Sequence, residues 1–197
     1  MFAFLAGVAA GLLHVFSGPD HLAAVAPLAS DRVRRQWMTG LQWGIGHTLG
    51  VLLIGALLLL LKEQLPLDAI SAYSERVVGA SLILIGIFGM WRATRGSNGH
   101  THSHAGTSVA MGTIHGLAGS SHLFGVLPAL AFPSRTSSVL YLSGFGIGAI
   151  AGMTAFSAAM GLLSERLGRG QSRRYSGLLY ASSAAALVVG GFWLVGR

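Results

Sequence analysis

Long apolar stretches separated by short polar segments run along the chain. Six of them approach the roughly 20 mostly apolar residues that a membrane-spanning helix needs. They cover residues 2–29, 37–61, 77–91, 108–132, 139–163 and 175–195, and the third is short unless it begins before Arg76. The runs are continuous rather than alternating, which is not the pattern of membrane β-strands. The pattern therefore predicts an all-α polytopic membrane protein with six transmembrane helices.

Composition supports this prediction. Hydrophobic residues make up 52% of the 197 positions, charged residues 10%, and the mean hydropathy is +0.64. Soluble domains carry about 25% charged residues, and disordered chains combine low hydrophobicity with high charge, so both classes are excluded. The absence of cysteine excludes disulfides, zinc ribbons and thiol catalysis. The 29 glycines suit close helix packing in lipid.

The basic residues predict an orientation. The net charge of +7 fits membrane topology better than nucleic-acid binding, so no nucleic-acid partner is expected. Arginine is concentrated in the segments that follow the first, third and fifth stretches, which should therefore be cytoplasmic. Both termini are then outside, and the expected location is a bacterial-type inner (cytoplasmic) membrane. The first stretch lacks a positive leading segment and an uninterrupted apolar run, so it is interpreted as a mature helix rather than a signal peptide.

The chain contains an internal repeat. The segment Gly11-Leu-Leu-His14-Val-Phe-Ser-Gly-Pro-Asp20-His21-Leu lines up with Gly112-Thr-Ile-His115-Gly-Leu-Ala-Gly-Ser-Ser-His122-Leu, and Gly44-Ile-Gly46-His47 lines up with Gly144-Phe-Gly146-Ile147. Each unit then has three helices, and an odd number inverts the second unit. The predicted organisation is a first repeat at 1–95, a His-rich linker at 96–107 and a second repeat at 108–197. Inverted repeats are typical of secondary transporters, although duplication of a scaffold without transport is an alternative.

Ionisable residues inside the expected spans point to a metal site. They are His14, Asp20, His21, His47, His115 and His122. A charge at the centre of a membrane helix costs about 2.5–3.5 kcal/mol, so Asp20 needs a function and a partner. Pro19 should kink or break the first helix beside it. The second repeat has Ser120-Ser121 in place of Pro19-Asp20, so the two halves are not equivalent.

The ligand types narrow the class of ion. Imidazole and carboxylate without thiolate suit Ni²⁺, Co²⁺, Zn²⁺ or Mn²⁺ better than Cu⁺. For each histidine taken alone, a hydrogen-bonded core side chain is the alternative, most of all for His115 and His122. The loop histidines His100, His102 and His104 either collect metal weakly or belong to an incidental linker.

Two segments resemble a known family. The run His14-Val-Phe-Ser-Gly-Pro-Asp20-His21-Leu is similar to the first signature of the nickel/cobalt transporter superfamily, particularly its UreH-like (urease accessory/nickel permease) branch. Gly44-Ile-Gly46-His47-Thr resembles the second signature. The resemblance implies that His14, Asp20, His21 and His47 take part in metal selection and passage. The larger nickel permeases have four residues between the first His and the Asp, where this chain has five, and they have eight helices with further acidic signatures that are not found here.

The predicted function is therefore transport of a divalent transition metal, nickel first and cobalt second, as cargo and without an organic cofactor or enzymatic activity. The expected partners are the metal ion and the lipid bilayer, and a homo-oligomer is left open. The alternatives are a membrane-embedded metalloenzyme, a small-anion exporter, and a metal sensor or accessory subunit. An enzyme would need an open coordination position and a separate general base, for which Asp20 is the sole buried acid expected. A buried Asp also opposes an anion.

Overall fold

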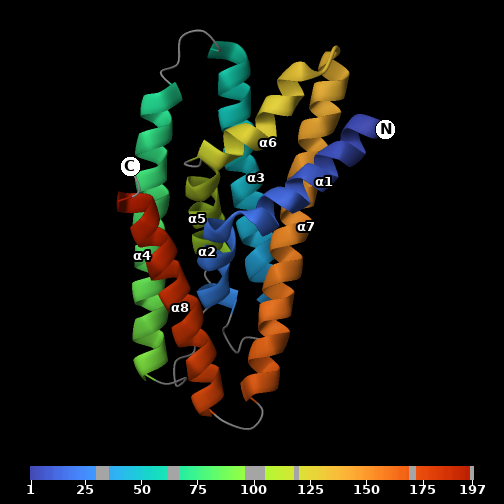
Figure 1. Ribbon diagram of the computed structural model, residues 1–197. Coiled ribbons are helices and arrows are strands. Elements are labelled where there is room, and N and C mark those ends of the chain that lie inside the picture. Colours follow the sequence, from blue (N-terminus) through green and yellow to red (C-terminus); the bar gives the residue numbers. More distant parts are fainter. Residues whose placement is uncertain (30–35, 62–66, 96–104, 118–119, 169–171, 196–197) are drawn as a thin grey trace.

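The computed structural model describes residues 1–29, 36–61, 67–95, 105–117, 120–168 and 172–195. These residues form eight α-helices and no strand (Figure 1). In chain order the helices are α1 (Phe2–Ser17), α2 (Pro19–Ala29), α3 (Gln36–Leu61), α4 (Leu67–Arg95), α5 (Ala105–Leu117), α6 (Ser120–Ala131), α7 (Arg135–Gly168) and α8 (Ser172–Val195). The all-α prediction is confirmed for the described residues.

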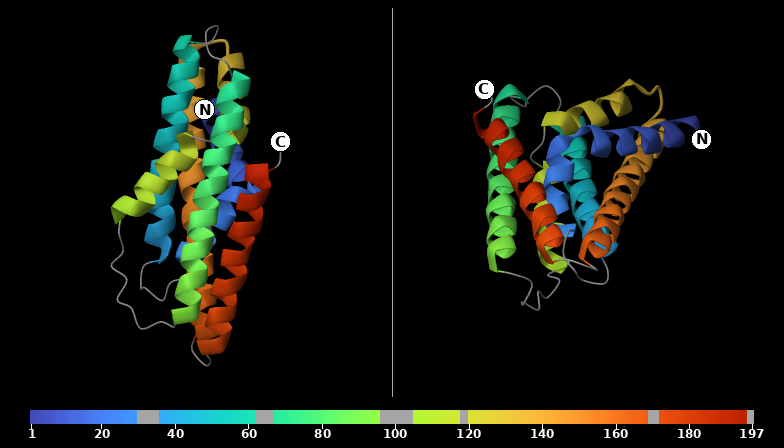
Figure 2. Two further views of the ribbon diagram at one scale, coloured as in Figure 1. Left: turned by 90° about the vertical axis from the view of Figure 1, so that its left-hand side faces the viewer. Right: turned by 60° about the horizontal axis from the view of Figure 1, so that its bottom comes forward.

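Four helices, α3, α4, α7 and α8, are long and apolar enough to cross a membrane by length and composition. They run along the length of the molecule (Figure 2). Helices α1 and α2 pass the same test only as a pair, bent by 73°. The fourth expected span, 108–132, falls on α5 and α6, and residues 118–119 between them lie outside the described residues. Six membrane crossings therefore remain a prediction.

The break between α1 and α2 follows from two residues. Pro19 has no backbone N–H to donate, and it occupies the first position of α2, where that donor would be unused. Gly18 is extended, with φ −86° and ψ 102°, and its amide donates to the His14 carbonyl at 3.1 Å, which closes the last turn of α1. The predicted kink is confirmed at this position.

Two helices are longer than their apolar stretches. Helix α4 begins at Leu67 rather than at residue 77, and α7 runs from Arg135 to Gly168 rather than over 139–163. Hydropathy marks only the part of a helix that suits lipid, whereas backbone hydrogen bonding continues through polar residues such as Ser, Glu and Arg at both ends. The third span is therefore long enough, because α4 begins before Arg76.

Glycines allow two pairs of helices to pack with their backbones close together. Helix α1 runs beside α7 in the same direction, with Gly7 and Gly11 of α1 against the α7 backbone and Gly144 and Gly148 of α7 against the α1 backbone. Helix α5 runs beside α3 in the same way, through Gly112 and Gly116 on α5 and Gly46 and Gly50 on α3. Helices α3 and α7 cross in opposite directions, as do α4 and α8. Small residues are what permits such close approach in lipid.

Helix α2 lies in the middle of the bundle, where it contacts α3, α4, α7 and α8 (Figure 1). Most α2 side chains are buried, and Ala23, Ala24 and Val25 belong to the largest apolar cluster together with Trp43, Leu82 and Met153. Large apolar side chains such as Leu53, Leu84 and Phe192 are exposed on the outside of the long helices, as lipid-facing residues would be. The polar residues of α2 are therefore held at the centre of the bundle.

We expect Gly148→Ala to destabilise the fold. The new methyl group would meet the Val8 carbonyl of α1, and α1 would have to move, at a cost of about 1–3 kcal/mol. Gly191→Ala, within α8, is the matched control because a methyl group there meets nothing within 4 Å. Thermal unfolding in detergent at one scan rate should show a lower midpoint for Gly148→Ala than for Gly191→Ala. Equal midpoints would contradict the close α1–α7 contact.

Candidate metal centre

Five of the six predicted ligands lie together in one cluster. His14 comes from the last turn of α1, Asp20 and His21 from the first turn of α2, His47 from the middle of α3, and His115 from the last turn of α5. Asp20, His21, His47 and His115 are buried, and His14 is partly buried. Both halves of the chain thus contribute to the cluster.

The carboxylate of Asp20 connects two imidazoles. Its Oδ1 lies 3.0 Å from His21 Nδ1, and its Oδ2 lies 3.2 Å from His115 Nε2. A carboxylate only accepts hydrogen bonds, so the two rings donate to it. A buried carboxylate is strongly unfavourable unless it is paired and hydrogen-bonded, and these contacts reduce that cost. Asp20 therefore joins α2 of the first half to α5 of the second.

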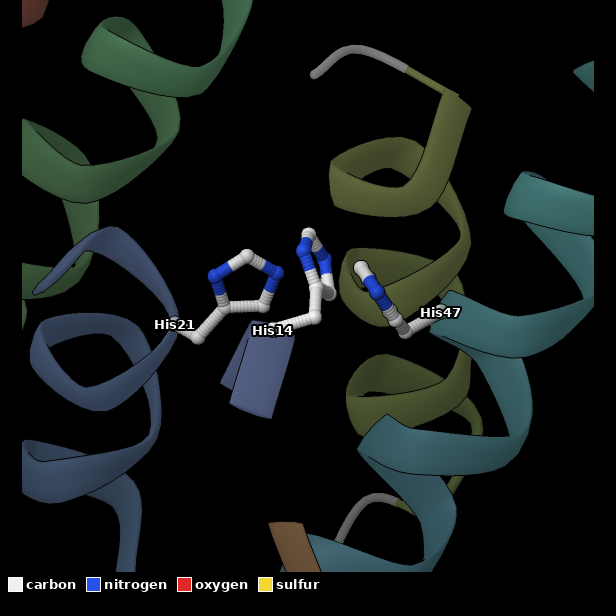
Figure 3. Close-up of side chains that lie close together, drawn as sticks. All are labelled: His14, His21 and His47. Atoms are coloured by element: carbon white, nitrogen blue, oxygen red, sulfur yellow. The ribbon is translucent and has the colours of Figure 1, made fainter. Parts of the chain in front are cut away.

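Four histidine rings surround one small volume. The ring centroid of His21 lies 4.6 Å from that of His14, 4.9 Å from that of His47 and 5.2 Å from that of His115. The His14 and His47 rings are stacked at 5.7 Å. Figure 3 shows His14, His21 and His47 converging from three separate segments. His21 is thus the central member of the group.

The helix ends around the cluster favour a cation. The carbonyl end of a helix carries partial negative charge, and the carbonyl ends of both α1 and α5 lie at the cluster, next to His14 and His115. Asp20 adds a carboxylate at the amino end of α2, where a negative side chain is itself stabilised. The combination places acceptors and negative charge around the imidazoles.

Gly18 and two aromatic side chains form part of the surroundings. A methyl group on Gly18 would collide with the His21 ring and approach Asp20 Oδ1 to 2.8 Å. Trp43 of α3 lies beside His115, with ring centroids 5.9 Å apart, and Phe145 of α7 lies beside His14 at 5.4 Å. Both aromatic side chains are fully buried. These rings fix the sides of the cluster that face α3 and α7.

The donors form two groups that are each compact enough for one ion. One group is His14, His21 and His47, and the other is Asp20, His21 and His115. Within each group the ligand atoms lie within 4.8 Å of one another. Imidazole nitrogen and carboxylate oxygen are suitable donors for divalent transition metals. The arrangement is chemically suited to hold such an ion after a small inward movement of the side chains.

The remaining sequence predictions have different outcomes. His122 lies on α6, but its side chain is outside the described part of the chain, and so are His100, His102 and His104. Trp43 and Phe145 were not among the site residues predicted from the sequence. The two rings could have been paired by aligning 44–50 with 146–152, which share the glycines at their first, third and seventh positions and place Phe145 opposite Trp43.

Comparisons with known proteins add three relatives. No protein-family model and no solved structure matches the chain. The chain is 38% identical over 200 residues to the chloroplast protein FOR GROWTH AND FERTILITY 2 of Arabidopsis thaliana and 35% identical over 206 residues to FOR GROWTH AND FERTILITY 1. Each match covers 93% of this chain but only 54% and 56% of those proteins, so the chain spans about half the length of these two relatives.

The third relative is the urease accessory protein UreH of Bacillus sp. (strain TB-90). The two sequences are 30% identical over 174 residues, which covers 79% of this chain and 75% of UreH. The match therefore extends over most of both proteins rather than over one shared motif. The chain therefore belongs to the family of the urease accessory protein UreH.

Proposed function

We propose that the protein carries a divalent transition-metal ion, nickel first and cobalt second, across a membrane as a secondary-type transporter. One observation carries the proposal: a carboxylate and four imidazoles from both halves of the chain meet inside a bundle of apolar helices. Intramembrane ionisable groups are rare, and they commonly mark ion pathways. The resemblance to nickel/cobalt transporters and the urease accessory role in the name of UreH support the choice of nickel.

The cluster suits a cation better than the anion that a small-anion exporter would carry. Asp20 contributes negative charge, and the carbonyl ends of α1 and α5 next to it repel anions. Imidazole accommodates nickel, cobalt and zinc, and a carboxylate balances part of their charge. The donor set therefore favours a class of ions, and the resemblance to nickel/cobalt transporters supports nickel within that class.

A membrane metalloenzyme is supported less well. Hydrolytic metal chemistry needs an open coordination position and a general base near the bound water. Asp20 is the sole carboxylate in either metal-binding group among the described residues, and both of its oxygens already bond to histidines. A single acid would have to serve as ligand and base at once.

We further propose six crossings in two inverted repeats, with units at 1–95 and 108–197 joined by 96–107. Three observations support the repeat. Helix α1 packs on α7 as α5 packs on α3, and the carbonyls of Phe145 and Trp43 meet Gly11 and Gly112 in the two pairs. Helices α2 and α6 both contain an internal proline, Pro27 and Pro128. In such transporters one repeat moves against the other around a site near the midplane, often on broken helices.

Nickel flux into proteoliposomes tests the transport proposal. We expect uptake by the wild-type chain and a reduction of about tenfold or more in Asp20→Asn and in His21→Ala, because loss of a carboxylate that supports a ligand already costs about 10–100-fold and loss of the ligand removes the metal bond itself. Ser81→Ala is the control, since Ser81 is also buried and polar but donates to the Val78 carbonyl of its own helix, away from the cluster. A nickel-sensitive dye inside the vesicles reports the rate.

The results separate the alternatives. Unchanged flux in both cluster variants would contradict the site. Tight nickel binding by the wild type without flux would favour a sensor or an enzyme. Proteoliposome flux of cobalt and zinc at equal concentration ranks the ions and tests the preference for nickel.

Gly18→Ala tests whether His21 must be pre-positioned. The added methyl group would displace the His21 ring and disturb its bond to Asp20, although the backbone angles at Gly18 are ordinary for alanine. We expect nickel affinity, measured by isothermal titration in detergent, to fall about tenfold, since supporting contacts are worth that much at metal sites. Gly191→Ala, where nothing lies within 4 Å of the new methyl group, should bind normally. Wild-type affinity in Gly18→Ala would show that the tight contact is unimportant.

Cysteine labelling tests the proposed orientation, with both termini outside a bacterial-type cytoplasmic membrane. The chain has no cysteine, so single replacements need no background removal. Thr107 on α5 and Thr136 on α7 are both exposed. In intact cells an impermeant maleimide should label Thr136→Cys, whereas Thr107→Cys should react only after permeabilisation. The opposite pattern would reverse the orientation and leave the metal site unaffected.

A further inference from the structure

His21 belongs to both groups of candidate metal ligands. Its ring centroid lies 4.9 Å from His47 and 5.2 Å from His115, whereas His47 and His115 are 6.4 Å apart. One group, with His14 and His47, contains imidazoles alone. The other, with Asp20 and His115, contains the carboxylate. The two groups therefore share one ring but differ in their other donors.

The two nitrogens of His21 face different groups. Nδ1 lies 3.0 Å from Asp20 Oδ1. In Figure 3 one ring nitrogen of His21 points toward His14 and His47 while the other points away from them. Since Nδ1 is directed to Asp20, the nitrogen near His14 and His47 is Nε2. Each group can thus use its own nitrogen of the shared ring.

A neutral imidazole has one nitrogen lone pair available and one N–H. When Nε2 binds a metal ion, Nδ1 carries the proton and donates it to Asp20, which then supports the ligand from outside as carboxylates commonly do for metal-bound histidines. When Nδ1 binds an ion beside Asp20 and His115, the proton is on Nε2. The two arrangements are tautomers of the same ring, so changing between them leaves the number of protons on the protein unchanged.

We propose that the cluster is a two-position relay in which one metal ion at a time is bound either by Asp20, His21 and His115 or by His14, His21 and His47. This inference rests on the proposed transport function and specifies how its site is used. The carboxylate position neutralises part of the ion's charge, and the imidazole position holds it without a directly bound acid. Because a neutral His21 ring has one nitrogen lone pair at a time, the two positions are mutually exclusive. A binding site that can release its ion in steps suits conduction.

Paired variants separate the two positions. Asp20→Asn with His115→Ala keeps the three ligands of the imidazole position but removes the carboxylate that supports His21 from outside. His14→Ala with His47→Ala keeps the three ligands of the carboxylate position. We expect wild-type protein in detergent to bind one Ni²⁺ per chain by isothermal titration. Each paired variant should also bind one, more weakly, while His21→Ala should lose affinity by about a hundredfold, the upper end of what a lost metal-site partner costs. X-ray absorption should show imidazole ligands without carboxylate in the first pair and a carboxylate ligand in the second.

Two outcomes would overturn the two-position relay although the wild type binds nickel. Loss of binding in both paired variants, with both proteins still folded by size exclusion, would show one undivided site. Two ions bound at once by the wild type would contradict mutual exclusion, and that measurement needs no variant. If an alanine pair fails to fold, the corresponding glutamine pair replaces it. Absence of nickel binding by the wild type contradicts the proposed function itself, whereas the predicted binding pattern without flux contradicts transport and supports the two positions.

Discussion

The carboxylate of Asp20 is buried in a bundle of apolar helices, and most of the central structure is arranged around it. A charge there is costly unless partners surround it, and His21 and His115 supply hydrogen bonds to its two oxygens. The first bond is local, because His21 is the next residue and Gly18 leaves space for its ring. The second requires α5, from the other half of the chain. The pairing of one acid thus links two distant segments.

Glycine packing makes that link possible. Gly112 and Gly116 on α5 rest against the carbonyls of Trp43 and His47, so α3 and α5 approach as closely as their backbones allow. This contact brings His47 and His115 to the same level of the bundle. Helix α1 is held against α7 by the same device, which places His14 opposite them. Side chains larger than hydrogen at these positions would separate the helices and widen the cluster.

The sequence predicted the local part of this arrangement better than the tertiary part. The break at Pro19 depends on neighbouring residues, and the motif predicted it. The hydrogen bond between Asp20 and His21 is also local, but the sequence placed them only as candidate ligands of one ion. The inclusion of His47 and His115 followed from their place in apolar helices, but their distances depend on helix packing that no single stretch encodes. The predicted repeat aligned Gly44 with Gly144. In the helix contacts, however, Gly46 has the same role in the α3–α5 pair that Gly148 has in the α1–α7 pair. The sequence alignment was two residues away from this equivalence because glycines two residues apart allow more than one register. The span predicted from hydropathy was also shorter than α4, because hydropathy measures the preference of a segment for lipid rather than the length of the helix.

The asymmetry of the two halves has a chemical consequence. The first half has Pro19-Asp20 where the aligned position of the second half has Ser120-Ser121, and among the described residues a single acid belongs to a cluster built from both halves. A second carboxylate would neutralise a divalent ion fully and hold it more tightly, which favours storage over passage. No carboxylate at all would leave the ion's whole charge uncompensated in a medium where charges are costly. One acid shared with neutral imidazoles lies between these limits. For the proposed transport, the cluster would combine enough negative charge to admit a divalent ion with imidazole ligands that can release it.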